Sequence, residues 1–230
     1  MQKNYRFLLL DLDGTLYDFE RAEAAALSDL LASWGLACGS RELEAYHQFN
    51  DACWKALERG EITKEQLKSK RFQDFLAFIG FEYDPVLAGE EYSENLSHYG
   101  FLLPGAIELL QALVKRYELY AVTNGIQKVQ LGRWAASGIG VYFNNMFVSE
   151  EVGIAKPHSG YFEHVFAHIP GFCKEQTLLI GDSLSSDMKG GINAGIDTLW
   201  YNPSHIIKPQ DLPITYEMDS LEKIQRFLCN

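Results

Sequence analysis

The chain has few cysteines, no excess of basic residues and no long apolar run. The cysteines form neither a CxxC pair nor a zinc-type spacing, which favours reduced thiols over a disulfide framework or a metal finger; they are Cys38, Cys53, Cys173 and Cys229. No stretch of about 18 apolar residues and no basic leader with an apolar core occurs, so we expect a cytoplasmic protein without a membrane segment.

The charge balance narrows the class of partner. Lys and Arg number 20 against 31 Asp and Glu, a formal net charge of −11. A nucleic-acid polymer needs a basic face, so this balance argues against one as partner. A small phosphorylated substrate is compatible with this negative charge if a cation and local hydrogen-bond donors offset the repulsion. Of the 230 residues, 47% are hydrophobic, enough for a packed core in one large domain or one domain with an insertion. We expect a monomer or weak dimer.

The most informative stretch is Phe7-Leu-Leu-Leu10 followed by Asp11-Leu-Asp13-Gly-Thr15. Four apolar residues predict a strand buried on both faces, as in parallel sheets covered by helices. Asp11 and Asp13 then lie at its carboxyl end, where open α/β sheets bind ligands. Two carboxylates at so short a separation need a cation, a proton or hydrogen-bond donors to offset their repulsion. The stretch is typical of a metal-assisted phosphoryl-transfer site, although a strand followed by an ordinary Asp-Gly turn gives the same pattern.

Residues from about 20 to 100 show helical patterns only. Helices are expected over Glu20–Trp34 and Ser40–Leu57, and a third begins at the capping-box sequence Thr63-Lys-Glu-Gln66. A fourth follows Asp84-Pro85, with aspartate as cap and proline at the first helical position. The sequence therefore predicts a helical bundle inserted after the first strand.

From Leu103 onward, strands alternate with helices. Expected strands are 118–123, 146–149, 177–182, 198–201 and about 214–217, and a last helix is expected to be capped by Asp219. This alternation predicts a parallel sheet covered by helices on both faces. We expect an α/β core made of residues 1–18 and 101–230 and a helical cap made of residues 19–100.

Three further motifs follow predicted strands or loops near the same sheet edge. Thr123-Asn124-Gly125 offers donors for a phosphoryl oxygen, Lys156-Pro157 offers a cation, and Gly181-Asp182-Ser183 is followed by Asp187. Carboxylates of this kind suit Mg²⁺. Taken singly, these motifs also fit an Asn-Gly turn, a solvated lysine and a helix cap.

Together, the four motifs resemble those of the haloacid dehalogenase-like (HAD) hydrolases. The resemblance implies a Rossmann-like core in which the first and fourth strands are neighbours. It implies that Asp11 is the nucleophile that forms an aspartyl-phosphate, and that Asp13 is the acid and then the base. Mg²⁺ would be held by Asp11, the main-chain carbonyl of Asp13 and Asp182, with Asp187 supporting the site. Thr123, the backbone of Asn124 and Lys156 would hold the phosphoryl group.

Asp13 also favours phosphate chemistry, since HAD dehalogenases carry no acid at that position. Other segments resemble the pyrimidine-nucleotide 5′-phosphatases of this family, among them Glu61-Ile-Thr-Lys-Glu65, Leu103-Pro-Gly105 and Trp200-Tyr-Asn-Pro203. The resemblance implies hydrolysis of nucleoside 5′-monophosphates, with a sugar-phosphate phosphatase, a phosphomutase or a non-catalytic regulator as alternatives. Side chains that could contact the leaving group, or simply pack the bundle, are Tyr17, Phe19, His47, Asn50 and Trp54.

Overall fold

The described part of the chain, residues 3–229 of a computed structural model, contains one six-stranded parallel sheet. Its order is β3-β2-β1-β4-β5-β6. The strands are β1 (Phe7–Leu10), β2 (Glu118–Thr123), β3 (Asn145–Val148), β4 (Thr177–Gly181), β5 (Asp197–Tyr201) and β6 (Tyr216–Met218). The expected pairing of the first and fourth strands is confirmed, with Leu10 opposite Ile180. The fold class predicted from the sequence is therefore correct.

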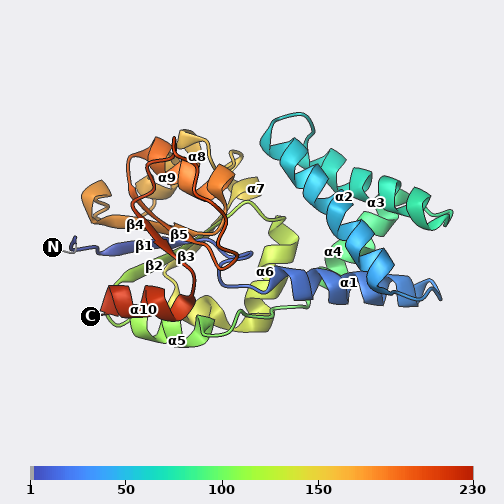
Figure 1. Cartoon of the computed structure of the whole chain (residues 1–230), viewed down its shortest axis with the longest axis horizontal. Helices are drawn as coiled ribbons and strands as arrows, with labels where there is room; N and C mark the ends of the chain where they lie inside the picture. Colours follow the sequence, from blue (N-terminus) through green and yellow to red (C-terminus); the bar gives the residue numbers. More distant parts are fainter. Residues whose placement is uncertain (1–2, 230) are drawn as a thin grey trace.

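Helices cover both faces of the sheet because its central strands are apolar on both sides. Leu8 and Leu10 of β1 face a cluster with α5 (Ala106–Leu113) and α10 (Leu221–Cys229). Phe7 and Leu9 face α8 (Ser159–Ala167) and α9 (Lys189–Ala194) on the other side (Figure 1). Short helical turns complete the two layers: α7 (Ser149–Val152), η2 (Lys174–Gln176), the π-turn η3 (Leu184–Met188) and η1 (Ile139–Tyr142). Of these, η1 packs on the α5 side, since Ile139 and Tyr142 belong to the cluster with α5 and α10.

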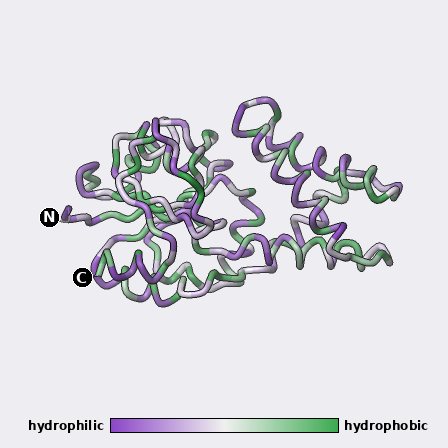
Figure 2. Tube along the Cα trace, in the orientation of Figure 1, coloured by the Kyte–Doolittle hydropathy of each residue, from purple (hydrophilic) through white to green (hydrophobic). Residues whose placement is uncertain are grey.

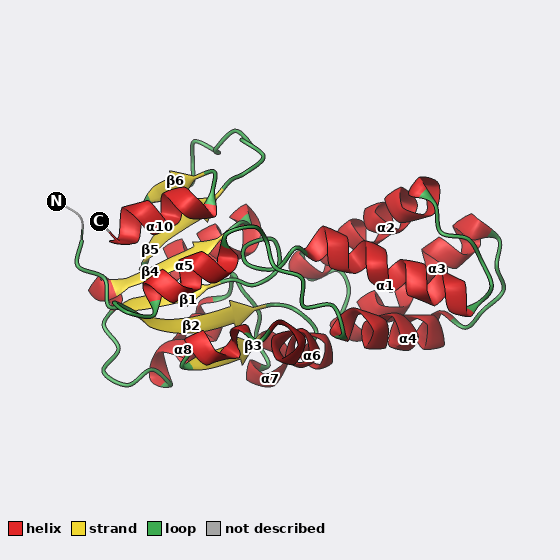
Figure 3. Ribbon diagram, turned by 90° about the horizontal axis from the view of Figure 1, so that it is seen from below, coloured by secondary structure: helices red, strands yellow, loops and turns green. Residues whose placement is uncertain are grey.

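A bundle of helices lies beside the sheet and is joined to it by loops (Figure 3). Its helices are α1 (Phe19–Ser33), α2 (Ser40–Glu58), α3 (Lys64–Ile79) and α4 (Pro85–Ser97). The capping box predicted at Thr63 and Gln66 is present, and Asp84 caps α4. Hydrophobic and hydrophilic residues alternate along these helices (Figure 2), and the aromatic rings of Tyr46, Phe72 and Tyr92 pack in the bundle interior. The expected helical insertion is thus present.

Helix α6 (Gln127–Ser137) joins the two parts. Ile126, just before it, and Val129 are buried in the hydrophobic cluster of the bundle. A Cβ on Gly132 would lie 2.6 Å from the Cβ of Ser97, so α4 and α6 approach as closely as glycine permits. We propose residues 19–100 as the cap and 1–18 with 101–230 as the core; residues 1, 2 and 230 lie outside the described chain.

Two local expectations differ from the structure near the carboxyl end. The last strand begins at Tyr216 and not at Ile214, because Ile214 is buried against Met188 and Trp200 instead of extending the ladder. Helix α10 is capped by Ser220, whose hydroxyl accepts from the main-chain N–H of Lys223. The predicted cap, Asp219, instead pairs with the Lys223 ammonium.

Within residues 3–229, we find no helix with both the length and the apolarity needed to cross a membrane.

Candidate active site

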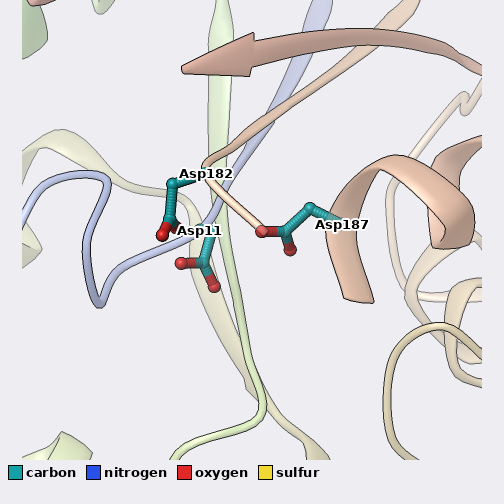
Figure 4. Close-up of side chains that lie close together, drawn as sticks. All are labelled: Asp11, Asp182 and Asp187. Carbon is teal, nitrogen blue, oxygen red and sulfur yellow. The ribbon is translucent and has the colours of Figure 1, made fainter. Parts of the chain in front are cut away.

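Three carboxylates meet at the carboxyl edge of the sheet. Asp11 follows β1, Asp182 follows β4, and Asp187 comes from η3. An oxygen of each lies within 4.8 Å of an oxygen of the others, and Figure 4 shows the three groups turned toward a common space. The adjacent ends of β1 and β4 bring Asp11 and Asp182 together, as the sequence predicts.

Lys156 lies among these carboxylates and is fully buried. Its Nζ donates to Asp11 Oδ1 at 2.5 Å, to Asp187 Oδ1 at 2.6 Å and to the carbonyl of Val122 at 2.9 Å. The side-chain amide of Asn124 holds the main chain of Lys156 at both its N–H and its carbonyl. Asn124 therefore positions the lysine, and its side-chain groups are already engaged.

Burial dominates the protonation of this cluster. It raises the pKa of Asp11 well above its usual range, together with the charges of Asp187 and Asp182 and against the pull of Lys156. Burial and the charge of Asp187 raise the pKa of Asp182 to about 7. Burial lowers the pKa of Lys156, but the carboxylates of Asp11 and Asp187 outweigh it and hold that pKa above its ordinary value. Repulsion among the carboxylates makes this a place where added positive charge is stabilising.

The surroundings of Asp182 fit a small hard cation. Thr15 donates its hydroxyl to Asp182 Oδ1 at 3.0 Å, which orients the carboxylate, and Trp200 Nε1 donates to the Asp182 carbonyl. Gly14 adopts φ +79°, and a Cβ there would lie 2.5 Å from Asp182 Oδ2. The turn after β1 thus approaches the carboxylate too closely for any side chain. An all-oxygen donor set with few carboxylates is the type that Mg²⁺ prefers.

Thr123 and Asp13 flank the carboxylate cluster. Thr123 Oγ1 accepts from the N–H of Gly125 at 3.0 Å, so its hydroxyl proton is left to donate to a phosphoryl oxygen. The Asp13 carboxylate accepts hydrogen bonds from Gln130 and Arg133 of α6. The guanidinium of Arg133 in turn lies 4.3 Å from the ring centre of Tyr17.

A cleft of about 870 Å³ lies between the sheet edge and the bundle. Asp11, Asp13, Thr123, Asn124, Lys156, Asp182 and Asp187 all line it, so the structure brings the core residues predicted from the sequence together. Four of the five candidates for leaving-group contact also line it: Phe19, His47, Asn50 and Trp54. Tyr17 does not line this cleft: it is buried in the sheet-side cluster with its hydroxyl against Ser137, and it lines a smaller cavity that shares Asp13, Phe19 and His47 with the cleft.

A scan against family models matches residues 5–195 to the haloacid dehalogenase-like hydrolases. The chain belongs to this family. It is a HAD-type hydrolase, and the fold and the family identified from the sequence motifs are confirmed.

Curated HAD relatives align over nearly the whole chain. Pyrimidine 5′-nucleotidase PynA of Streptococcus pneumoniae is 44% identical over 96% of this chain and 93% of its own. Pyrimidine 5′-nucleotidase YjjG of Escherichia coli is 29% identical over 97% of each. A crystal structure of the HAD-hydrolase YfnB of Bacillus subtilis, bound to magnesium, has a TM-score of 0.94 and 38% identity, covering 99% of this chain and 100% of that one.

Three residues of this HAD site were not among the candidates from the sequence. Gln130 and Arg133 bind the Asp13 carboxylate, and their spacing of three on one helix was the available signal. Lys64 of the cap reaches the core, where its Nζ donates to Ser149 Oγ at 2.8 Å and to the carbonyl of Gly125 at 3.2 Å. Burial lowers the pKa of Lys64 to about 8. It belongs to the segment Glu61–Glu65, whose resemblance to nucleotide phosphatases was evident in the sequence.

Proposed function

We propose that the chain is a Mg²⁺-dependent phosphomonoesterase that hydrolyses nucleoside 5′-monophosphates, pyrimidine nucleotides first, through an aspartyl-phosphate. The observation that carries the proposal is the buried Asp11 carboxylate, bonded to Lys156 and close to Asp182 and Asp187, at the bottom of a cleft. Substrate class rests on the named activities of PynA and YjjG.

The residues divide the reaction into two displacements. An Asp11 oxygen attacks phosphorus while the bond from phosphorus to the ester oxygen breaks, and Asp13 gives that oxygen its proton. Asp13, now a carboxylate, then takes a proton from water as the water oxygen attacks phosphorus. The bond between phosphorus and the Asp11 oxygen breaks, inorganic phosphate leaves and both side chains return to their first state.

The remaining residues mainly offset the negative charge of the phosphoryl group and of Asp11. An anionic nucleophile and an anionic phosphoryl group repel each other, and the Lys156 ammonium, 2.5 Å from Asp11, reduces this repulsion. The Thr123 hydroxyl donates to a phosphoryl oxygen. Asp11, Asp182 and the main-chain carbonyl of Asp13 would hold Mg²⁺, with Asp187 in support, and the ion when bound would neutralise phosphoryl charge.

The decisive experiment is phosphate release from a panel of nucleoside monophosphates and sugar phosphates, with Mg²⁺ or with chelator. Wild type is compared with Asp11→Asn and with Asp211→Asn, an exposed control. We expect metal-dependent release that is strongest for UMP or dTMP, lost in Asp11→Asn and retained in Asp211→Asn. Preference for sugar phosphates would overturn the proposed substrate class but would leave the proposed mechanism intact. Activity retained in Asp11→Asn would overturn the aspartyl-phosphate.

A further inference from the structure

A chain of polar side chains runs through the interior of the helical cap. Glu23 of α1 accepts from His47 Nδ1 at 2.7 Å and from Asn50 Nδ2 at 2.7 Å, both on α2. Asn50 Oδ1 accepts from Nη1 of Arg71 on α3 at 2.9 Å. Glu23, Asn50 and Arg71 are all buried, although the surrounding bundle is packed with aromatic and aliphatic residues.

This arrangement is costly for a bundle that needs only to fold. Buried charges lose hydration, and Nε and Nη2 of Arg71 have no hydrogen-bond partner within residues 3–229. Replacing such a network by apolar residues is often neutral or stabilising. A network kept at this cost is explained if it positions a functional side chain. It ends at His47, whose side chain is 53% exposed and lines the cleft.

The network fixes the His47 ring and leaves one nitrogen for a ligand. Nδ1 is engaged by Glu23, while Nε2 has no partner within the described chain. The hydrogen bond to the Glu23 carboxylate raises the pKa of His47, which favours the form with donors on both nitrogens. Asn50 differs, because both ends of its amide are engaged inside the bundle. Of these two side chains, His47 is thus the one with a free donor.

His47 lines the same part of the cleft as Asp13, the proposed proton donor. Asp13, Phe19 and His47 line both the main cleft and a smaller cavity of about 460 Å³ next to it. A leaving group that takes its proton from Asp13 therefore passes along the wall formed by Phe19 and His47. An aromatic face with an adjacent N–H donor suits a flat ring that carries carbonyl oxygens.

We propose that His47, held by Glu23, determines substrate specificity by donating a hydrogen bond from Nε2 to a carbonyl oxygen of the pyrimidine base. This inference rests on the proposed function, since it deepens the substrate class assigned to the same cleft. It assigns Glu23 as a positioning residue that acts through His47.

Binding to the non-hydrolysing Asp11→Asn protein tests the inference without turnover. Calorimetric titrations with UMP and with ribose 5-phosphate, in Mg²⁺, compare Asp11→Asn alone with the same protein carrying His47→Phe, Glu23→Gln or His98→Phe. His98 is an exposed histidine paired with Glu94 and serves as the matched control. We expect His47→Phe to weaken UMP binding about tenfold to a hundredfold and to leave ribose 5-phosphate within about twofold. Glu23→Gln should weaken UMP binding less, and the control should match the parent.

A second measurement separates contact from general damage to the cap. The ¹⁵N resonance of His47 Nε2 should shift on adding UMP and should not shift on adding ribose 5-phosphate. If the parent prefers UMP but His47→Phe keeps that preference, or the resonance does not respond to UMP, the inference is overturned while the proposed function stands. If the parent binds both ligands equally, the proposed substrate class falls and the inference falls with it.

Discussion

Replacing Lys156 by methionine should cost a large part of the stability of the protein. Methionine fills a similar volume but leaves the carboxylates of Asp11 and Asp187 buried without their shared cation. Lys156 makes two charged hydrogen bonds, of 2.5 and 2.6 Å. At about 1.5–3 kcal/mol each, these give roughly 3–6 kcal/mol, and breaking buried ion pairs typically costs about 3–5 kcal/mol. We expect a loss of about 3–5 kcal/mol out of a total of about 5–15 kcal/mol.

The loss should depend on pH and on divalent ions. Burial already raises the pKa of Asp11, and removing the lysine raises it further, so the folded variant binds more protons than the unfolded chain. The contribution of Asp11 to stability is therefore fully present below the pKa of the unfolded carboxyl group and is lost as pH rises through its folded pKa, so the deficit should widen as pH rises from acid towards neutral. Mg²⁺ should restore part of the loss by supplying charge to the same carboxylates.

Urea unfolding followed by circular dichroism, in chelator and near neutral pH, measures this effect. Lys115→Met is the matched control, because Lys115 is exposed and has no ion pair or side-chain hydrogen bond within the described chain. We expect the control to stay within about 0.5 kcal/mol of wild type. If Lys156→Met were as stable as Lys115→Met, the carboxylates would not depend on the lysine and the electrostatic reasoning would be wrong.

Three further predictions concern the groups around this cluster. Gly14→Ala should lower Mg²⁺ affinity in calorimetry by about tenfold or more, because its Cβ would lie 2.5 Å from Asp182 Oδ2. Gly60→Ala is the control and should leave the affinity unchanged, because Gly60 has a similar φ of +73° and no neighbour within 4 Å. Because the pKa of Asp182 is raised to about 7 and protons compete with the metal, the Mg²⁺ dissociation constant should rise about tenfold from pH 8 to pH 6; a flat profile would contradict this. Arg133→Lys should misplace the Asp13 carboxylate and lower kcat about tenfold or more with little change in KM; an effect on KM alone would refute that role.

That the core candidates meet at one edge of the sheet was predictable from the sequence, because their position depends on chain topology. Asp11 and Asp182 follow apolar strands, and the carboxyl ends of parallel strands meet at one edge whatever the details of packing. The partners of Asp13 were missed for the opposite reason. Gln130 and Arg133 meet it only because α6 packs at a particular angle and depth, and the helical pattern does not encode that angle.

In the cap, too, local features were predictable and contacts between distant segments were not. Its four helices and the capping box at Thr63 were predictable because they depend on residues close in sequence. The link from Glu23 to His47 and the reach of Lys64 to Gly125 join segments 24 and 61 residues apart, and they depend on how those segments pack. Tyr17 illustrates the ambiguity of aromatic residues, since nothing in the sequence separates its buried position from that of Phe19 in the cleft.

The shared helix α6 has a consequence for domain exchange. Ile126 and Val129 complete the hydrophobic interior of the cap, and Gly132 fits against Ser97 with no room for a methyl group. In a chimera that carries a relative's insertion at residues 19–100, the new cap helices would therefore pack poorly against α6. A protein without the cap would expose the apolar surface of α6. The transplantable unit is the insertion together with α6. Since α6 also carries Gln130 and Arg133, which bind Asp13, grafts that change substrate preference would alter the position of this proposed proton donor as well.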